Sequence, residues 1–341
     1  SVAVGDSLSP VQAVGVLVLG SLFYGVRPEL LPFLPMFFGS IGIAFFYFLA
    51  CQLTKERRVS AVCASLLAFS PPYLTWSRFL FSNIIAFSFF IGGVLFYLRM
   101  LEKRKAASLE CAILFCAAIF VRYDYALPIF TLQLSSILWR KKMGRLAVMQ
   151  LITAFIILLF VILAINCNLY GSPFVTGYDL VRTGMKTPES AYLLWQFRFT
   201  TPFVLERVVY VNERFVIGLM PTIFIMGILG LASGIRNNGM RSRLVVALGL
   251  VAAVLGIYYG TNVFHGYGDE RILLTASYTR YFLPLYSFLT LLSSFFLRHV
   301  YRTRRGKYLA TLLLVLTLTT FLQSITCLLY TSPSPRDRTR S

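Results

Sequence analysis

The chain has 341 residues, of which 57% are apolar and 13% charged, and its mean hydropathy is +0.74. Soluble domains hold about half apolar and about a quarter charged residues, so this composition excludes an ordinary soluble enzyme and a disordered chain. The formal net charge of +19 would indicate nucleic-acid binding in a soluble protein. In so apolar a chain we instead expect the lipid bilayer as a partner and no nucleic acid, and the positions of the charges test this.

Ten apolar stretches are predicted as transmembrane helices: eight are near the length of about 20 residues that a span needs, and two, 106–121 and 126–139, are shorter. These stretches are 30–53, 59–76, 79–98, 106–121, 126–139, 146–167, 215–235, 244–263, 281–297 and 308–326. Only one charged residue, Glu110, interrupts them, and it lies near one end of its stretch. The sequence therefore predicts an all-α polytopic membrane protein with about ten transmembrane helices.

The basic residues gather in every second connection between the predicted spans. These connections carry nineteen Lys and Arg side chains against three acids, whereas the opposite side carries ten against nine. The positive-inside rule assigns the basic side to the cytoplasm. The charge is therefore a topology signal, and we expect a multi-pass protein of a prokaryotic cell membrane rather than of the endoplasmic reticulum.

Two segments on the expected outer side differ from ordinary spans. Residues 11–25 are apolar but only fifteen long, so we expect a short interfacial or re-entrant helix there, with a tilted span as the alternative. The connection 168–214 is 47 residues long and rich in aromatic residues, among them Tyr170 and Tyr178. Such a connection is typical of a folded cap over a site, or of an aromatic belt at the membrane interface.

The two ends of the chain differ from its middle. Residues 327–341 begin with a stretch that resembles the translated read-through of a sequencing adaptor, so we expect an artefact there and a metagenomic fragment truncated at both ends. The expected organisation is 1–29 as the remnant of a first outer loop with its interfacial helix, 30–167 as a membrane core module of six spans, 168–214 as the outer loop, and 215–326 as four further spans.

An arginine and an aspartate lie in a tight turn between two short spans. The segment 106–139 has 34 residues for two passes and a turn, fewer than two full spans need, so we expect Arg122-Tyr-Asp-Tyr125 to lie below the outer surface. Ionisable groups at membrane depth are costly and usually line a cavity. The alternative is a local pair of Arg122 and Asp124 that caps two helix ends.

Two further arginines, Arg78 and Arg280, stand at the outer ends of spans, where the positive-inside rule gives no reason for a cation. Arg280 follows a polar loop that carries His265 and Asp269. Because the planar guanidinium group suits phosphate, these two arginines and Arg122 together indicate an anionic lipid site. Snorkelling of each side chain toward the lipid headgroups is the alternative interpretation.

Four short motifs occur in order on the expected outer side. They are Phe69-Ser-Pro-Pro-Tyr-Leu-Thr-Trp-Ser-Arg78, Phe120-Val-Arg-Tyr-Asp124, Asn168-Leu-Tyr-Gly-Ser-Pro-Phe-Val-Thr-Gly-Tyr178 and Arg280-Tyr-Phe-Leu-Pro284. Together they resemble motifs of the polyprenyl-phosphate-sugar-dependent glycosyltransferases of the C-type membrane superfamily. The protein mannosyltransferase and lipid A aminoarabinose transferase groups are the most similar.

The resemblance implies an inverting transfer of a sugar from a dolichyl- or undecaprenyl-phosphate carrier to an acceptor on the outer face. It implies that Arg280, with Arg122 and Arg78 behind it, holds the lipid phosphate. The residues that it suggests for sugar or acceptor binding are Tyr123, Asp124, Tyr170, Tyr178, Tyr281, His265 and Asp269. Whether the acceptor is a protein, as in protein glycosylation, a lipid or a glycan stays open.

The acidic residue that serves this superfamily as catalytic base has no clear counterpart in the chain. We expect it upstream of Ser1, with Asp6 and Asp124 as the weaker candidates inside the chain, so the fragment itself is expected to fold without full activity. The six cysteines and two histidines show no metal-ligand spacing, and no metal site is predicted. The sequence names no cofactor and leaves a requirement for a divalent cation open.

A multi-span lipid or solute transporter or flippase is the alternative function, because membrane-embedded charges also mark substrate paths in such proteins. Transporters usually show internal repeats with broken helices at matching places, and the sequence shows no convincing repeat. The concentration of motifs on one side favours the glycosyltransferase.

Overall fold

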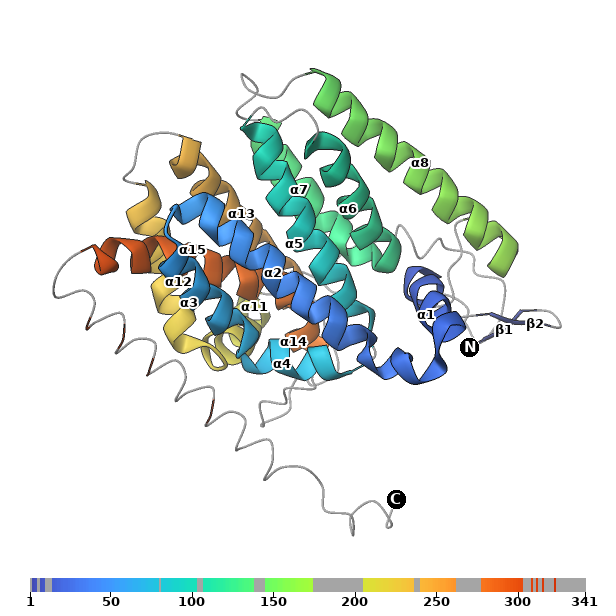
Figure 1. Ribbon diagram of the computed structural model, residues 1–341, viewed down its shortest axis with the longest axis horizontal. Coiled ribbons are helices and arrows are strands. Elements are labelled where there is room, and N and C mark those ends of the chain that lie inside the picture. Colours follow the sequence, from blue (N-terminus) through green and yellow to red (C-terminus); the bar gives the residue numbers. More distant parts are fainter. Residues whose placement is uncertain are drawn as a thin grey trace, which may run out of the picture.

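The computed structural model describes residues 2–4, 7–9, 14–79, 81–102, 107–137, 145–173, 205–235, 240–261, 277–302 and the single positions 308, 311, 315 and 322. The described secondary structure is helical apart from a small antiparallel hairpin of β1 (Val2–Val4) and β2 (Ser7–Ser9). The predicted all-α class is therefore confirmed for the body of the protein (Figure 1).

The first part of the chain contains the predicted short N-terminal helix and two long apolar helices. Its elements are α1 (Val14–Val26), the 3-10 helix η1 (Pro28–Phe33), α2 (Leu34–Thr54), α3 (Arg57–Ala68), α4 (Pro71–Arg78) and α5 (Ser82–Leu101). The middle part supplies α6 (Ala107–Val121), the 3-10 turn η2 (Tyr123–Tyr125), α7 (Ala126–Ile137) and α8 (Arg145–Tyr170).

The last part of the chain supplies the remaining described helices. They are α11 (Leu205–Asn212), the π-helical turn η3 (Glu213–Ile217), α12 (Pro221–Ile235), α13 (Met240–Thr261), α14 (Ser277–Tyr281) and α15 (Leu283–Tyr301).

The predicted span 59–76 is not one straight helix. Ser70 has an extended backbone (φ −63°, ψ 137°), and α4 starts with two prolines in its first turn. Proline disfavours the helical conformation in the residue before it, so α3 ends before this pair and α4 continues at 61° to it. The sequence contained the signal, Pro71-Pro72, but we expected the helix to run through it.

The predicted span 215–235 is also wrong at its start. Residues 215–217 belong to η3, which continues α11, and α12 begins only at Pro221. The two helical pieces meet at 105°. Proline at the first helical position has no N–H to lose there, which makes Pro221 a favourable start for the new helix.

In the part of the chain that the structure describes, four helices are long and apolar enough to cross a bilayer, namely Pro28–Thr54, Ser82–Leu101, Ile152–Tyr170 and Leu283–Tyr301. The number rises to six if each bent pair forms one span, and Gly15–Val26, Ala107–Val121 and Val245–Thr261 are shorter apolar helices. These helices are those of an integral membrane protein. The count of about ten spans stays a prediction, and most of the predicted span 308–326 lies outside the described residues.

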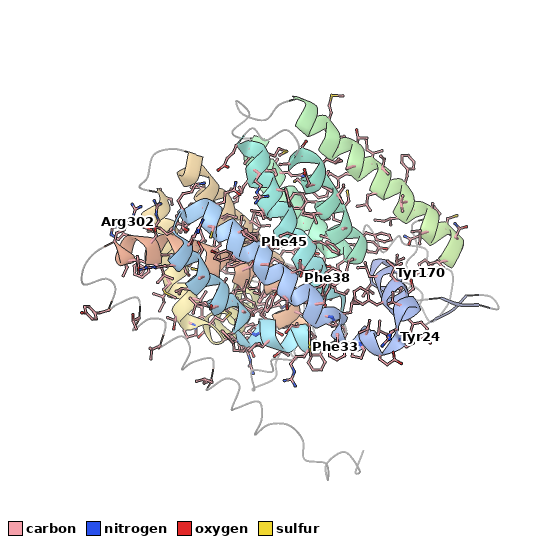
Figure 2. The ribbon with its side chains drawn as sticks, in the orientation of Figure 1. Tyr24, Phe33, Phe38, Phe45, Tyr170 and Arg302 are labelled. Carbon is pink, nitrogen blue, oxygen red and sulfur yellow. The ribbon has the colours of Figure 1, made fainter. Side chains whose placement is uncertain are left out.

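Two helices form the centre of the bundle and one lies at its edge. Most residues of the apolar segment are buried in α5 (78%) and in α15 (83%), whereas only 11% of them are buried in α8. Figure 1 shows α8 on the outside of the bundle, packed along α6. On α2, Phe38 and Phe45 lie over the neighbouring helices (Figure 2), and the Phe38 ring is 5.3 Å from that of Phe89 on α5.

Three of the basic connections meet at one end of the bundle. Arg58 donates a hydrogen bond to the Tyr301 hydroxyl (2.9 Å), Arg302 pairs with Glu56, and Lys55 pairs with Glu102 (4.0 Å). The last residues of α2, α5 and α15 and the first residues of α3 therefore lie together, and the start of α5 lies at the other end of the bundle. There α4 and α14 are neighbours, at the lower edge of Figure 1. We call the first end the basic end and the second the α4–α14 end.

Candidate functional site

The recessed turn after α6 holds its arginine against its own aspartate. Arg122 donates from Nε to Asp124 Oδ1 (2.8 Å) and from Nη2 to Asp124 Oδ2 (3.1 Å), which is a bidentate pair. The side chains are only 12% and 17% exposed. The pair that sequence reasoning kept as an alternative is therefore present, and it occupies one edge of the Arg122 guanidinium group.

The first turn of α5 supplies the other partners of Arg122. Its Nη1 donates to Ser82 Oγ (3.2 Å) and to Asn83 Oδ1 (3.0 Å). The backbone carbonyl of Asn83 accepts a hydrogen bond from the Tyr125 hydroxyl at 3.3 Å.

Arg280 comes from far along the chain and contacts the same aromatic ring as Arg122. The guanidinium carbon of Arg122 is 5.0 Å from the centre of the Tyr281 ring, and that of Arg280 is 5.1 Å from it. Both cations therefore contact one aromatic ring, within the range of cation–π interactions. The structure thus brings Arg122 and Arg280 to one ring, and their role in binding a lipid phosphate stays a prediction.

Aromatic rings from α4 and the start of α5 complete the surroundings of Arg280. Its guanidinium carbon lies 5.7 Å from the Trp76 ring and 5.6 Å from the Phe81 ring. The Trp76 indole donates to Thr279 Oγ1 at 2.9 Å, which ties α4 to α14. Arg280 is thus half-buried in an aromatic frame, and Arg78, two residues beyond Trp76, lies exposed at the end of α4.

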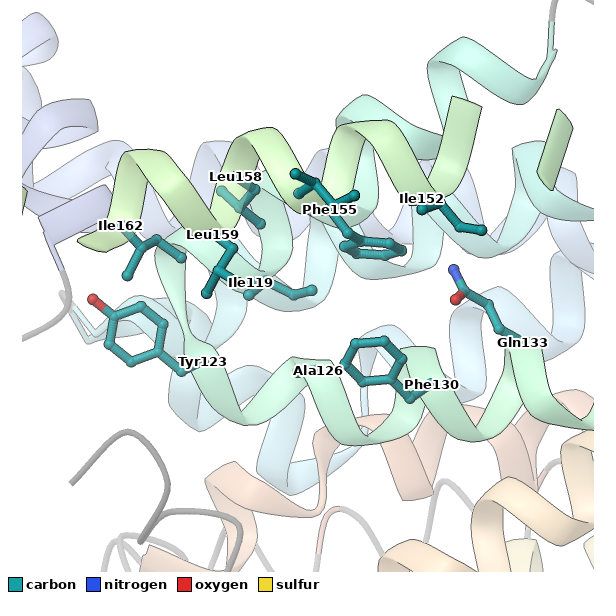
Figure 3. A pocket seen from close by; sticks show the side chains of 11 residues that line it. Ile119, Tyr123, Ala126, Phe130, Gln133, Ile152, Phe155, Leu158, Leu159 and Ile162 are labelled. Atoms are coloured by element: carbon teal, nitrogen blue, oxygen red, sulfur yellow. The ribbon is translucent and has the colours of Figure 1, made fainter. Parts of the chain in front are cut away.

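An apolar groove begins next to this cluster. It runs between α7 and α8 with α6 at its base, has a volume of about 400 Å³, and is shown in Figure 3. Its lining is Ile119, Tyr123, Ala126, Phe130, Gln133, Ile152, Phe155, Ile156, Leu158, Leu159 and Ile162. Tyr123 lies at one end and Gln133 at the other, and Tyr123 directly follows Arg122 in the chain. Tyr123 and Gln133 are ten residues apart along the helical chain, so the groove is about 15 Å long.

The other candidate residues are distributed around or beyond this region. Tyr170 is buried at the end of α8. Tyr178, His265, Asp269 and Asp6 lie outside the described residues, so their placement stays a prediction.

No three His, Cys, Asp or Glu side chains come together in a possible metal site within the described part of the chain. The divalent cation that the sequence left open therefore gains no candidate ligands there.

Sequence reasoning missed the polar start of α5. Ser82 and Asn83 are buried and both accept from Arg122, yet they were counted as part of an apolar span. The available signal was weak: two adjacent polar residues at the outer start of a helix that is otherwise apolar. It also missed the groove, because apolar side chains on three helices carry no sequence mark that separates a groove from a lipid-facing surface.

Two further arginines, Arg207 on α11 and Arg214 on η3, lie near the α4–α14 end. Arg207 donates to the carbonyl of Thr261 (3.2 Å), and Arg214 donates to the Tyr210 hydroxyl (2.5 Å). Phe215 stacks on Tyr278 with ring centres 4.7 Å apart, which joins η3 to α14. Sequence reasoning placed these arginines on the outer side and gave them no role.

Comparison with known proteins identifies the architecture. No protein-family model matches the chain, and no curated protein matches it. Two solved structures of ArnT from Cupriavidus metallidurans are similar to it. The structure bound to undecaprenyl phosphate has a TM-score of 0.58 at 16% identity over 86% of this chain, and the apo structure has 0.57 at 15% over 86%.

The chain spans about half the length of ArnT, 51% and 50% of the two structures. At such low identity the likeness concerns the fold alone. The order and packing of the described helices thus show a chain that has the fold of ArnT.

Proposed function

We propose that the protein is an integral membrane glycosyltransferase that moves a sugar from a polyprenyl-phosphate donor to an acceptor on the outer face of the membrane. The observation that carries this proposal is the shared contact of Arg122 and Arg280 with Tyr281, in a chain with the fold of a protein that binds undecaprenyl phosphate. Two guanidinium groups beside one aromatic ring at the end of a helical bundle suit a phosphate headgroup.

Arg280 is the first choice for the contact to the lipid phosphate. Arg122 donates from Nε and Nη2 to the Asp124 carboxylate, so part of its positive charge is compensated inside the protein. In sugar transfer the phosphate is the leaving group, and fixed guanidinium donors stabilise the charge that develops on it. Arg122 would support this contact from behind, and the exposed Arg78 would act at the entrance.

The groove between α7 and α8 suits the polyprenyl chain of such a donor. Its lining is almost entirely apolar, and its one aromatic hydroxyl, that of Tyr123, stands at the end beside Arg122. A lipid with an anionic head and an apolar tail fits this order of surfaces, because the tail gains the free energy of apolar burial while the head meets the arginines. About 400 Å³ accommodates the first isoprenoid units of the chain rather than all of it.

Asp124 is a poor candidate for the catalytic base, because Arg122 holds both of its carboxylate oxygens. A base from the outer side, Asp6 or a residue upstream of Ser1, therefore remains our proposal, with inversion at the anomeric carbon. We propose that Tyr123, Tyr170, Tyr178, Tyr281, His265 and Asp269 contact the sugar or the acceptor. The basic end would face the cytoplasm, and residues 168–214 would lie outside.

The direct test uses Arg280→Ala in lipid nanodiscs, with undecaprenyl phosphate titrated and its binding measured by native mass spectrometry. We expect binding about ten- to one-hundredfold weaker than in the unchanged protein, since a charge-assisted hydrogen bond contributes about 1.5–3 kcal/mol. Arg57→Gln, which removes an exposed arginine at the basic end, is the matched control and should bind normally. Equal affinity in Arg280→Ala and Arg57→Gln would refute the phosphate role.

A lipid flippase is the second candidate, and the two sharply bent helix pairs favour it. Breaks of 61° and 105° within apolar helices resemble the discontinuous helices of transporters. A proteoliposome assay separates the two functions. Movement of a fluorescent polyprenyl phosphate between leaflets without any sugar transfer would favour the flippase, and sugar transfer without lipid movement would favour the enzyme.

A further inference from the structure

Asn83 occupies a central position in the arginine cluster. It is the second residue of α5 and is 1% exposed. Two elements far away in the chain, η2 and α14, contact it at this point. A fully buried amide at the start of a membrane helix costs free energy unless its donors and acceptors are used, so its contacts indicate why it is there.

The Asn83 side chain uses both halves of its amide. Oδ1 accepts a hydrogen bond from Nη1 of Arg122 at 3.0 Å, and Nδ2 donates to the backbone carbonyl of Arg280 at 3.5 Å. Its own backbone carbonyl accepts from the Tyr125 hydroxyl. One residue therefore links the two arginines, the first through its guanidinium group and the second through its main chain.

Only a neutral amide can make both contacts. An aspartate of the same shape would accept from Arg122 but could not donate to the Arg280 carbonyl, and an alanine would do neither. An aspartate would also change the charge of the cluster. Among the described residues that make up this cluster, Arg122, Arg280 and Asp124 carry two positive charges and one negative charge, and a second carboxylate would cancel the excess that an anion requires.

We propose that Asn83 is a positioning residue for the lipid phosphate, which holds Arg122 and the Arg280 backbone in one arrangement while leaving the positive charge of the cluster available. The inference deepens the proposed function and rests on it. Ser88 provides the contrast, since it is a buried hydroxyl on the same helix that donates to the backbone carbonyls of Ile84 (2.8 Å) and Phe38 and lies outside the arginine cluster.

The test compares Asn83→Asp, Asn83→Ala and the control Ser88→Ala in the full chain reconstituted in nanodiscs. Undecaprenyl phosphate is titrated, thermal unfolding midpoints are recorded, and amide hydrogen exchange is followed over residues 277–282. We expect Asn83→Asp to bind the lipid at least tenfold more weakly, Asn83→Ala about threefold more weakly, and Ser88→Ala within twofold of the unchanged protein. The loss in Asn83→Ala is about the net value of one hydrogen bond, and the larger loss in Asn83→Asp comes from the added negative charge.

The order of the variants separates positioning from a structural role. A structural role predicts the larger loss of affinity in Asn83→Ala, which loses both contacts, and a mild effect of Asn83→Asp, which keeps the bond to Arg122. That order, or equal binding in all variants, would overturn the inference.

Failure of the proposed function gives a different result. If the unchanged protein does not bind undecaprenyl phosphate, hydrogen exchange still decides whether Asn83 positions the cluster. Faster exchange over 277–282 in both Asn83 variants, and not in Ser88→Ala, supports the positioning role. Unchanged exchange refutes it.

Discussion

The basic end and the α4–α14 end of the bundle both contain cationic side chains in ion pairs, but the pairs are exposed at the first end and largely buried at the second. At the basic end the ion pairs are loose and exposed: Lys55 and Glu102 are 4.0 Å apart with side chains 53% and 46% exposed, and Arg302 and Glu56 are 3.4 Å apart at 60% and 38%. At the α4–α14 end, Arg122 and Asp124 are 2.8 Å apart and only 12% and 17% exposed.

This difference in exposure separates the arginines that contribute only to the total charge from those whose individual contacts matter. Exposed pairs contribute about 0–1 kcal/mol each, so we expect the basic end to matter through its total charge, as the positive-inside rule predicts, rather than through single pairs. A buried guanidinium group must have its partners in place, because the cost of an uncompensated buried charge is several kcal/mol. The α4–α14 end therefore depends on individual residues.

The largest effect is expected for Asp124→Asn, which leaves Arg122 without its carboxylate. We expect a loss of about 2–3 kcal/mol in unfolding free energy, at the low end for buried pairs because both side chains keep some exposure. Thermal unfolding in nanodiscs measures it. The double variant Arg122→Gln with Asp124→Asn should be less destabilised than Asp124→Asn alone, since it removes the uncompensated charge. A double variant that is worse would contradict this account of the α4–α14 end.

A smaller effect is expected for Tyr281→Leu, which removes the ring that both arginines contact. Each cation–π contact contributes about 0.5–2 kcal/mol, so we expect undecaprenyl phosphate to bind about three- to tenfold more weakly. Tyr281→Phe keeps the ring and serves as the control. If both variants lose affinity equally, the hydroxyl rather than the ring matters, and the aromatic frame is not what organises the cluster.

The smallest effect is expected for Arg302→Gln at the basic end. The pair with Glu56 is exposed, so the unfolding free energy should change by less than about 0.5 kcal/mol, and the binding of undecaprenyl phosphate should not change. Thermal unfolding at low and high salt checks it, because any contribution of this pair should vanish at high ionic strength. A loss comparable with that of Asp124→Asn would show that the two ends do not differ as we describe.

Much of the site could be predicted from residues near in sequence, and the rest could not. Arg122 and Asp124 are two residues apart, so their pairing was foreseen as an alternative, and Arg280 was placed on the same side from its position at the end of a span. The role of Asn83 was not foreseen, because its partners are 39 and 197 residues away. The breaks before Pro71 and Pro221 show the opposite failure: the local signal was present, but the apolar run around it dominated the prediction.

By itself the sequence determined that this is an apolar, helical membrane protein with its basic residues gathered in every second connection between apolar runs, because apolar runs and charge counts are local properties. Only the tertiary structure decided that Arg122 and Arg280 share the Tyr281 ring, that Asn83 joins them, and that an apolar groove begins at Tyr123, the residue after Arg122. The physical reason is that these contacts connect α5, η2, α8 and α14. Their meeting depends on how the helices pack, which no single segment encodes.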